Sequence, residues 1–444
     1  MTHRKIDIGD LEAMPETGGV LILRLLDRLS SEGVSWVYLR NYENLPDEVG
    51  NDADILIPAG RRREVAAVLL EEARKLGWDC VGQGEFSPLA LYLANLRTGE
   101  ILHIDLFDRL EWHCLEFADA GVVLANRKWN EQVFIPDENS EVYLNVVTRL
   151  LYHGEIREKH RSQASSSPGG TEGLREEFQR QLGSAGPAVV DLLAADAWAP
   201  SVEGRRKVRR AAWLRYGMAR PSSLITGLWR YGRRVLSKIL RPPGRFLVFE
   251  GADGVGKSTV LADIVPWCKK WCGGQDAYRF HWKPMHVSRD VPKGDAPVDP
   301  RGRPLRSGIV SLVFLMWHVL GFWWGYLRRV RPLLVKNHAV IGDRYAYDIF
   351  LDPRRFRLRL PDFVCRWAAL VVPRPDVVVA LLADPEEIRS RKPELSHEEI
   401  ANYQARWAIL SHGRKSALDV STDAGPEETI GRVKRALLDA FADR

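Results

Sequence analysis

The sequence predicts an α/β protein with an α+β domain over residues 1–130, a helical connector over 131–243 and a parallel-sheet domain over 244–444. Strand and helix patterns alternate in the last part, which is typical of a parallel sheet with helices on both faces. The middle part has mainly helical spacing of apolar residues. A chain of 444 residues is also too long for one ordinary hydrophobic core, so we expect more than one domain.

Composition indicates a globular protein from a reducing compartment. Apolar residues make up 45% of the chain, and its five cysteines are too few and too scattered for a disulfide framework. The N-terminal sequence MTHRKIDIGD is polar and lacks the apolar core of a signal peptide. We therefore expect a cytoplasmic protein.

Two predicted strands of the N-terminal domain carry acidic residues on one face. Asp52 and Asp54 lead into an apolar strand, where alternation puts both on the same side. The segment Ile101–Phe107 (ILHIDLF) alternates similarly and places His103 and Asp105 together. Carboxylates held this close repel each other unless a divalent cation lies between them. Asp52, Asp54 and Asp105 are therefore predicted metal ligands, in a pattern that suits two-metal nucleotidyl transfer.

This pattern resembles the nucleotidyltransferase superfamily that includes DNA polymerase beta, over about residues 18–125. The resemblance implies binding of a nucleotide with Mg²⁺. The family's usual Gly-Ser before the aspartates is replaced here by Leu39-Arg40-Asn41-Tyr42, which leaves triphosphate binding open. A degenerate domain and surface-loop aspartates remain as alternatives.

The connector is strongly basic. From Gly204 to Arg245 there are 13 Lys or Arg residues and no Asp or Glu. Within it, Leu224–Arg241 predicts an amphipathic helix, with apolar residues on one face and cations mostly on the other. Such a helix can lie on an anionic membrane, or pack on the C-terminal domain with its arginines in solvent. No recognised nucleic-acid-binding module accompanies the charge, so we expect no specific nucleic-acid partner.

A phosphate-binding loop is the first element of the C-terminal domain. Gly251–Ser258 fits the pattern G-x-x-x-x-G-K-[ST], after a predicted strand at 245–250 and before a helical pattern. Such a loop aims backbone N–H groups at phosphate, so we expect ATP here, with Lys257 on its terminal phosphates and Ser258 on Mg²⁺. The predicted nucleotide-binding residues are Gly251, Asp253, Gly254, Gly256, Lys257, Ser258 and Thr259.

Four further strands complete the predicted sheet, at 278–282, 339–343, 377–382 and 417–421. The second of these ends at Asp343, with Arg344 directly after it. A carboxylate in this place can hold Mg²⁺ through water, and the arginine can clamp a phosphate.

A candidate lid follows the strand at 377–382. Its segment Glu386–Lys392 (EEIRSRK) contains Arg389 and Arg391, which could fold over the transferring phosphoryl group. Lys257, Asp343, Arg344, Arg389 and Arg391 are thus the predicted catalytic residues.

Three of these segments resemble thymidylate kinase in order and spacing. They are Phe249–Thr259 (FEGADGVGKST), Asp343-Arg344-Tyr345 and Pro385–Arg391 (PEEIRSR), and the resemblance covers about residues 245–444. It implies a P-loop nucleoside-monophosphate-kinase fold and Mg-ATP-dependent phosphoryl transfer.

The resemblance also implies roles for single residues. Asp253 matches the loop acid that contacts the acceptor sugar in the family. Gly254 stands where some members place a catalytic arginine, which implies that Arg389 or Arg391 of the lid supplies it here.

The acceptor motif departs from the family. An Arg-Glu-Pro-Gly-Gly segment is replaced by FHWKPM at residues 280–285, so we expect another nucleoside monophosphate or a sugar as acceptor as readily as thymidylate. Candidate residues for binding such an acceptor are Asp348, Asp352, Arg354 and Arg355. The last three fit a solvated turn equally well. Chains with this departure resemble kinases found alongside surface-polysaccharide enzymes.

The segment Ile309–Leu327 has no formal charge and is nearly long enough to span a bilayer. Its place between two strands of one sheet favours a buried or interfacial helix. Together with Leu224–Arg241 it leaves peripheral membrane contact open, and two copies of the chain could pair as a homodimer. The alternative function is a nucleotide-binding membrane or assembly adaptor that phosphorylates no acceptor.

Overall fold

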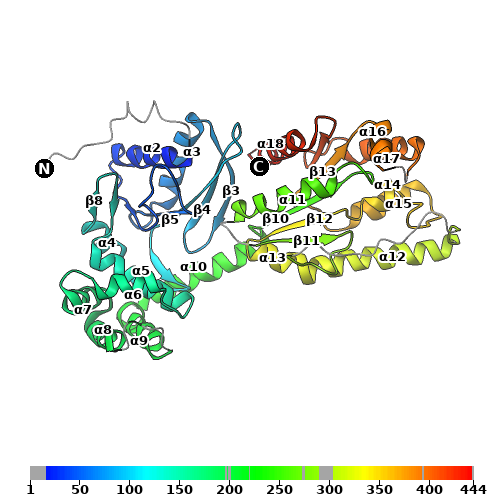
Figure 1. Cartoon of the computed structure of the whole chain (residues 1–444). Coiled ribbons are helices and arrows are strands. Elements are labelled where there is room, and N and C mark those ends of the chain that lie inside the picture. Colours follow the sequence, from blue (N-terminus) through cyan, green and yellow to red (C-terminus); the bar gives the residue numbers. More distant parts are fainter. Residues whose placement is uncertain are drawn as a thin grey trace. The chain divides into compact units, whose positions relative to one another are not determined.

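The computed structural model describes residues 17–195, 198, 202–219, 221–272, 276–289, 304–392 and 395–442. The N-terminal segment on which the expected absence of a signal peptide depends lies outside these residues. The chain divides into two compact units, coloured by sequence in Figure 1. Unit 1 comprises Met1–Leu93 and Leu102–Lys238, and unit 2 comprises Ala94–Ile101 and Ile239–Arg444.

Unit 1 is built on a five-stranded sheet in the order β1-β2-β5-β4-β3. Helices α2 and α3 contribute to the apolar core on this sheet, and the hydroxyl of Thr17 caps α2 by accepting from Val20 N at 3.4 Å. Strand β5 has the bounds that its alternation predicts, and it pairs in parallel with β2, with Asp54 opposite Asp105. The elements are α2 (Gly18–Ser31), β1 (Val37–Tyr38), β2 (Ala53–Leu56), α3 (Arg62–Lys75), β3 (Trp78–Glu85), β4 (Leu89–Asn95) and β5 (Ile101–Phe107).

The predicted helical connector belongs, as far as Lys238, to the same unit as this sheet. Its helices form a second core, in which the rings of Tyr143 and Phe178 meet edge to face at 4.8 Å. The elements are β6 (Leu110–Trp112), β7 (Leu115–Ala118), α4 (Ala120–Ala125), β8 (Lys128–Asn130), β9 (Val133–Ile135), α5 (Glu138–Tyr152), α6 (Glu158–Ser165), α7 (Gly170–Leu182), α8 (Gly186–Ala195), α9 (Val202–Ala212), a π-helical turn (Trp213–Met218) and α10 (Pro221–Leu240).

Helix α10 is amphipathic as predicted, but part of its basic side faces inward. Arg234 is buried and donates to Glu111 Oε2 at 2.9 Å, and Arg230 pairs with the other oxygen of the same carboxylate. Glu111 is itself buried, and a buried carboxylate requires a cation beside it. This requirement explains why these arginines point into unit 1, toward Glu111, while the apolar side of α10 faces away from it.

Unit 2 is a parallel five-stranded α/β unit with strand order β11-β12-β10-β13-β14. Helices α11 and α18 cover one face of the sheet, and α12 and α13 cover the other (Figure 1). The predicted strands are confirmed, β11 with a shift of one residue. The strands are β10 (Arg245–Glu250), β11 (Ala277–His281), β12 (Ala339–Asp343), β13 (Val377–Leu382) and β14 (Ala417–Ser421).

The helices of unit 2 connect these strands. Because all five strands are parallel, their carboxyl ends meet at one edge, where ligands of such sheets bind. The helices are α11 (Lys257–Cys268), α12 (Gly308–Gly325), α13 (Arg331–Val335), α14 (Asp348–Leu351), α15 (Asp362–Val371), α16 (Pro385–Arg391), α17 (His397–Ser411) and α18 (Pro426–Ala442), with a 3₁₀ turn at Lys270–Cys272 and a π-helical turn at Tyr326–Val330.

Candidate active site

The phosphate-binding loop lies between the central strand β10 and the N-terminus of α11. Gly256 caps α11 with a left-handed φ of 98°, and Gly254 also has a positive φ, 94°. A Cβ on Gly254 would lie 2.8 Å from the Cβ of Lys392, so a side chain does not fit there. The two glycines thus allow the loop to turn tightly beneath the segment that follows α16.

Lys257 is held inside this loop. Its Nζ donates to the carbonyl oxygens of Gly251 at 2.7 Å and Ala252 at 2.9 Å. Burial, and then repulsion from Arg344, lower the pKa of Lys257 to about 8. An arriving phosphate would reverse this effect, because a nearby anion favours the charged amine.

Asp343 ends β12 at the level of the loop, since it pairs in register with Phe249 of β10 and His281 of β11. Its Oδ2 lies 3.5 Å from His281 Nδ1, while its buried Oδ1 has no hydrogen-bond partner among the described residues. Burial would raise the pKa of Asp343, but His281 and Lys257 outweigh it and the pKa is lowered. An ionised carboxylate with a free oxygen fits the predicted Mg²⁺, and Ser258 is exposed at the start of α11 to join it.

Arg344 lies between two carboxylates. Its Nη2 donates to Asp253 Oδ1 at 2.6 Å, and its Nη1 donates to Asp348 Oδ2 at 2.9 Å. Both Arg344 and Asp348 are buried. Burial would raise the pKa of Asp253, but the nearby cations, Arg344 first among them, lower it. Arg344 therefore positions Asp253, and Asp348 faces Arg344 inside the unit.

Arg355 approaches the same loop acid from a half-buried position. Its Nη1 lies 3.5 Å from Asp253 Oδ2. Four residues were candidates to bind an acceptor: Asp348, Asp352, Arg354 and Arg355. Of these, Arg355 forms an ion pair with the phosphate-binding loop. Asp352 accepts from the backbone N of Arg355 at 3.2 Å, which is the turn interaction expected for it.

Glu250 and Tyr403 form hydrogen bonds at the start of the loop and beside it. Neither was predicted as a site residue from the sequence. The Tyr403 hydroxyl accepts from Gly251 N at 3.1 Å, and Glu250 accepts from Tyr345 N at 2.9 Å. Burial, and then the negative charge of Asp348, raise the pKa of Glu250 well above its usual range. The signal for Glu250 was an acid at the end of an apolar strand, whereas Tyr403 lies far along the chain and gave no local signal.

The predicted lid is helix α16, and it borders the loop. A Cβ on Gly254 would lie 3.3 Å from the carbonyl oxygen of Ile388. Arg391 pairs with Glu387 on the same helix. Arg389 is exposed and has no ion pair within the described part of the chain.

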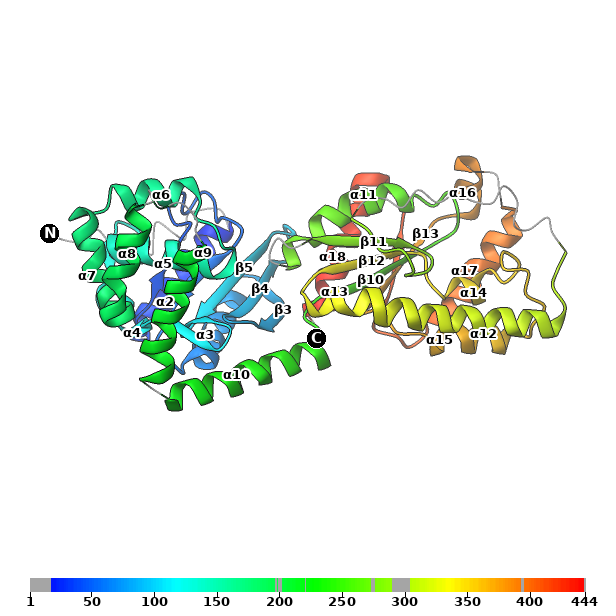
Figure 2. The same ribbon diagram turned by 90° about the horizontal axis from the view of Figure 1, so that it is seen from below.

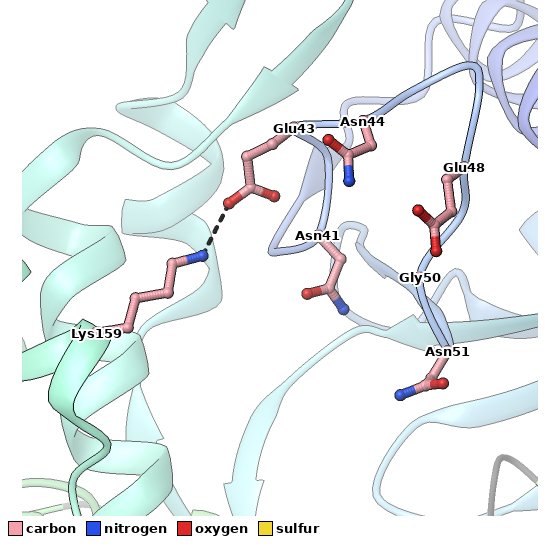
Figure 3. Close-up of a pocket in the computed structure, with 7 residues that line it drawn as sticks. All are labelled: Asn41, Glu43, Asn44, Glu48, Gly50, Asn51 and Lys159. Carbon is pink, nitrogen blue, oxygen red and sulfur yellow. Dashed lines mark hydrogen bonds and ion pairs between the residues drawn. The ribbon is translucent and has the colours of Figure 1, made fainter.

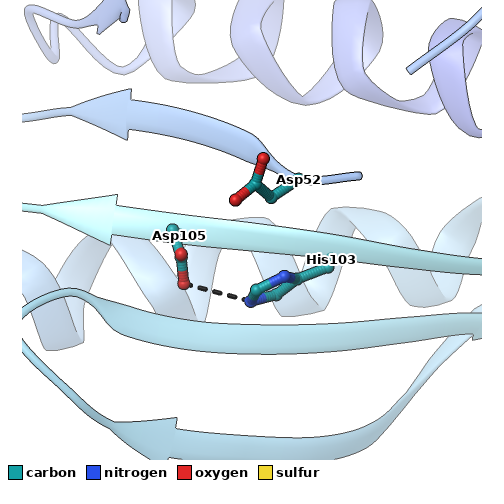
Figure 4. A group of neighbouring side chains, drawn as sticks. All are labelled: Asp52, His103 and Asp105. Carbon is teal, nitrogen blue, oxygen red and sulfur yellow. Dashed lines mark ion pairs between the residues drawn. The ribbon is translucent and has the colours of Figure 1, made fainter. Parts of the chain in front are cut away.

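A second cluster of side chains lies on the sheet of unit 1 (Figure 4). Asp52, His103 and Asp105 each offer a ligand atom, and these atoms all lie within 4.8 Å of one another. His103 Nε2 is 3.1 Å from Asp105 Oδ1, and the His103 ring stacks on Tyr92 at 4.5 Å. Burial lowers the pKa of His103, but Asp105 more than compensates and the pKa is raised. His103 thus joins two of the three predicted metal ligands.

The third predicted ligand, Asp54, is paired with a cation of the protein. Arg40 contacts Asp54 through its Nε, and its Nη2 lies 3.3 Å from Asp52 Oδ2. Burial raises the pKa of Asp54 to about 7, with Asp52 and Asp105 adding to it and Arg40 opposing it. Arg40 is one of the residues that replace the superfamily's Gly-Ser, so this departure supplies a positive charge beside the carboxylates.

A polar pocket of about 490 Å³ adjoins the cluster (Figure 3). Asn51 lines it and directly precedes Asp52, and Asn41 lines it and donates to Asp52 Oδ1 at 3.4 Å. Across the pocket Lys159 pairs with Glu43 at 3.1 Å. This lining of amides, carboxylates and an amine suits a polar ligand.

Comparisons with known proteins find similar solved structures but no family. No protein-family model matches the chain, and no curated protein matches it. Among solved structures, it is similar to thymidylate kinase from Ehrlichia chaffeensis, with a TM-score of 0.30 and 15% identity over 43% of this chain and 97% of that chain. A likeness at this level carries no argument about activity, which must therefore come from the geometry of the site.

Proposed function

We propose that unit 2 transfers the γ-phosphoryl group of ATP to a nucleoside monophosphate or a related sugar. One observation carries the proposal. The loop Gly251–Ser258 follows the central strand of a parallel sheet, and the neighbouring strand ends at the same level in Asp343, whose buried Oδ1 is unpaired among the described residues. A triphosphate site beside an available carboxylate is the arrangement that phosphoryl transfer requires.

The proposed roles follow from these contacts. Lys257 and the loop N–H groups bind the triphosphate, and Asp343 and Ser258 hold Mg²⁺, which neutralises charge on the β- and γ-phosphates. An acceptor oxygen bonds to the γ-phosphorus as the bond to the β-phosphate oxygen breaks, so that ADP leaves. Arg389 or Arg391 stabilises the developing charge from the lid.

The acceptor contacts are assigned to the far side of the loop. Arg355 beside Asp253 is the proposed acceptor cation, because Arg344 is enclosed by two carboxylates. Lys283, from the segment that departs from thymidylate kinases, lies 5.1 Å from the ring of Trp282, and burial lowers its pKa to about 8. An amine held among aromatic rings suits an acceptor that has both a ring and an anionic group.

An acceptor screen tests the proposal. We expect ADP release that depends on one acceptor, and a phosphorylated product in mass spectrometry, when the protein receives Mg-ATP with nucleoside monophosphates, thymidylate among them, or simple sugars. ATP binding without a phosphorylated product from any acceptor would contradict the proposal and favour the adaptor. A response to thymidylate alone would show that the departure at 280–285 does not change the acceptor.

A second candidate function belongs to unit 1, and Figure 4 shows the group of side chains that favours it. We propose that Asp52, His103 and Asp105 bind a divalent cation, and that the adjoining polar pocket accepts a nucleotide or a sugar phosphate beside it. Two carboxylates and an imidazole suit Mn²⁺ or Mg²⁺. Nucleotidyl transfer is the reaction class that this pairing of cation and pocket suits.

Asp105→Asn is expected to weaken Mn²⁺ binding to the nucleotide-free protein by at least about tenfold, because it removes an anionic ligand. Titration calorimetry measures the affinity. Asp79→Asn, on the edge strand β3, is the matched control and should bind as the unaltered protein does. Equal Mn²⁺ affinity in the two variants would refute the cation site.

A further inference from the structure

Helix α12 has two apolar sides, and the described residues cover only one of them. Its inward side, with Leu315 and Phe322, joins the core on the sheet. Its outward side carries large apolar residues, spaced three or four positions apart and each more than half exposed. They are Ile309, Val313, Trp317, Leu320, Trp324 and Leu327, which we call the α12 face. A surface helix of a soluble protein has polar residues in such places, and an exposed apolar patch of this kind is typical of a docking surface.

Neighbouring residues enlarge the α12 face. Figure 2 shows α15 beside α12, and Trp323 Nε1 donates to the carbonyl oxygen of Val371 at the end of α15, at 3.1 Å. Phe363 and Trp367 of α15 are also more than half exposed. The apolar surface therefore extends over two helices of unit 2.

The contacts of α12 require that its occupant lie along the helix. Gly308–Val335 is, within the described ranges, the one helical stretch long and apolar enough to cross a membrane, with a mean hydropathy of 1.6. However, a third of its most apolar 18-residue window is buried in the protein. The Phe322 ring lies 5.0 Å from Tyr345, and a membrane span would pull it out of the core. Contact in the plane of a surface keeps this packing intact.

The charged residues of the α12 segment itself are all positive. Residues 304–342 contain five Arg or Lys and no Asp or Glu. Arg328 and Arg329 are exposed where the face ends, and the Arg328 guanidinium lies 5.6 Å from the ring of Trp324. Apolar residues, tryptophans and adjacent arginines together complement a surface of anionic phospholipid.

A second copy of the chain is a poorer complement. In an antiparallel pairing of two α12 helices, Arg328 and Arg329 would approach the end of the partner helix nearest Arg306. In a parallel pairing, Arg328 and Arg329 would approach their own copies. Each case brings cations together without a carboxylate from this stretch, and like charges oppose association.

Unit 1 has an apolar stripe of its own. Because Arg230 and Arg234 turn inward to Glu111, the opposite side of α10 within unit 1 exposes Ile225, Leu228, Trp229 and Leu236. Separate protein partners would each have to recognise one stripe. A lipid surface needs no dedicated partner for either stripe.

We propose that the α12 face docks in the plane of an anionic phospholipid membrane, with its Trp and Leu side chains among the headgroups and Arg328 and Arg329 on the phosphates. The inference goes beyond phosphoryl transfer and does not depend on it. It places unit 2 at a membrane surface.

Vesicle flotation tests the proposal with the full chain. We expect it to float with vesicles of phosphatidylcholine and phosphatidylglycerol, and to float much less with phosphatidylcholine alone. Trp317→Ser with Leu320→Ser should weaken binding about a hundredfold, because two buried apolar side chains are lost. Arg328→Gln with Arg329→Gln should weaken it about thirtyfold, at about 1 kcal/mol for each arginine.

Ile409→Ser is the matched control, because Ile409 is an exposed apolar residue of α17 away from the α12 face, and it should float as the unaltered protein does. Light scattering of the same samples reports the oligomeric state. Equal flotation of the control and the Trp317/Leu320 variant would overturn the proposal. A second pair of results would also overturn the proposal. In it, the unaltered protein forms a dimer and does not float, and the Trp317/Leu320 variant is a monomer.

Discussion

Lys257→Ala is expected to lower acceptor-dependent ATP consumption by about 10²- to 10³-fold, the usual cost of losing one donor that stabilises transferring charge. The Lys257 amine already lies inside the loop, on the carbonyl oxygens of Gly251 and Ala252. It therefore needs little rearrangement to reach a terminal phosphate. Steady-state kinetics with the best acceptor from the screen measure the loss.

Two controls separate this loss from unfolding. Lys415→Ala removes an exposed amine from the same unit and should leave the rate unchanged. Thermal unfolding should show that Lys257→Ala remains folded, while its stabilisation by added Mg-ATP becomes smaller. Full activity of Lys257→Ala would mean that the loop is not the phosphoryl-donor site.

The parallel sheet of unit 2 was predictable because its strands are short apolar runs bounded by turns. RFLVFE at 245–250 and VVVALL at 377–382 are too apolar for an exposed face, and the helical patterns between strands exclude hairpins. Strand β11 ends one residue earlier than predicted. Trp282 has a φ of 57°, a left-handed conformation that cannot continue a strand.

The partners of the site residues could not be predicted, because they depend on which distant side chains meet. Asp343 was identified from its place at a strand end. The enclosure of Arg344 by Asp253 and Asp348, and the support of Gly251 by Tyr403, required the packing of separate elements. Local sequence patterns contain no information about contacts between residues that are far apart in the chain.

The orientation of α10 and the partner of Asp54 were missed for the same reason. Helical spacing in Leu224–Arg241 predicted an apolar and a basic face, but it did not predict which face points inward. The orientation depends on the buried Glu111, which binds Arg234. Alternation along the strands placed Asp54 near Asp105, but it did not show that Asp54 would form an ion pair with Arg40. Buried charges select their partners through tertiary contacts.

We expect Arg344→Gln to lower the free energy of unfolding by about 3–5 kcal/mol, the cost of removing one partner from a buried ion pair. Asp348 would lose the cation that both of its oxygens contact, at 2.9 and 3.1 Å, inside a fully buried setting. Denaturation in urea measures the change. Arg432→Gln breaks only the exposed pair with Glu428, and should cost at most about 1 kcal/mol.

A double variant distinguishes the lost charge pair from lost packing. Arg344→Gln with Asp348→Asn removes both buried charges and should recover much of the stability lost by Arg344→Gln alone, because no uncompensated carboxylate remains. The proposed phosphoryl transfer should stay low in this protein, since Asp253 still lacks the guanidinium that positions it. If the double variant instead loses the sum of the two single changes, Arg344 stabilises the unit through packing, and its pairing with Asp348 contributes little.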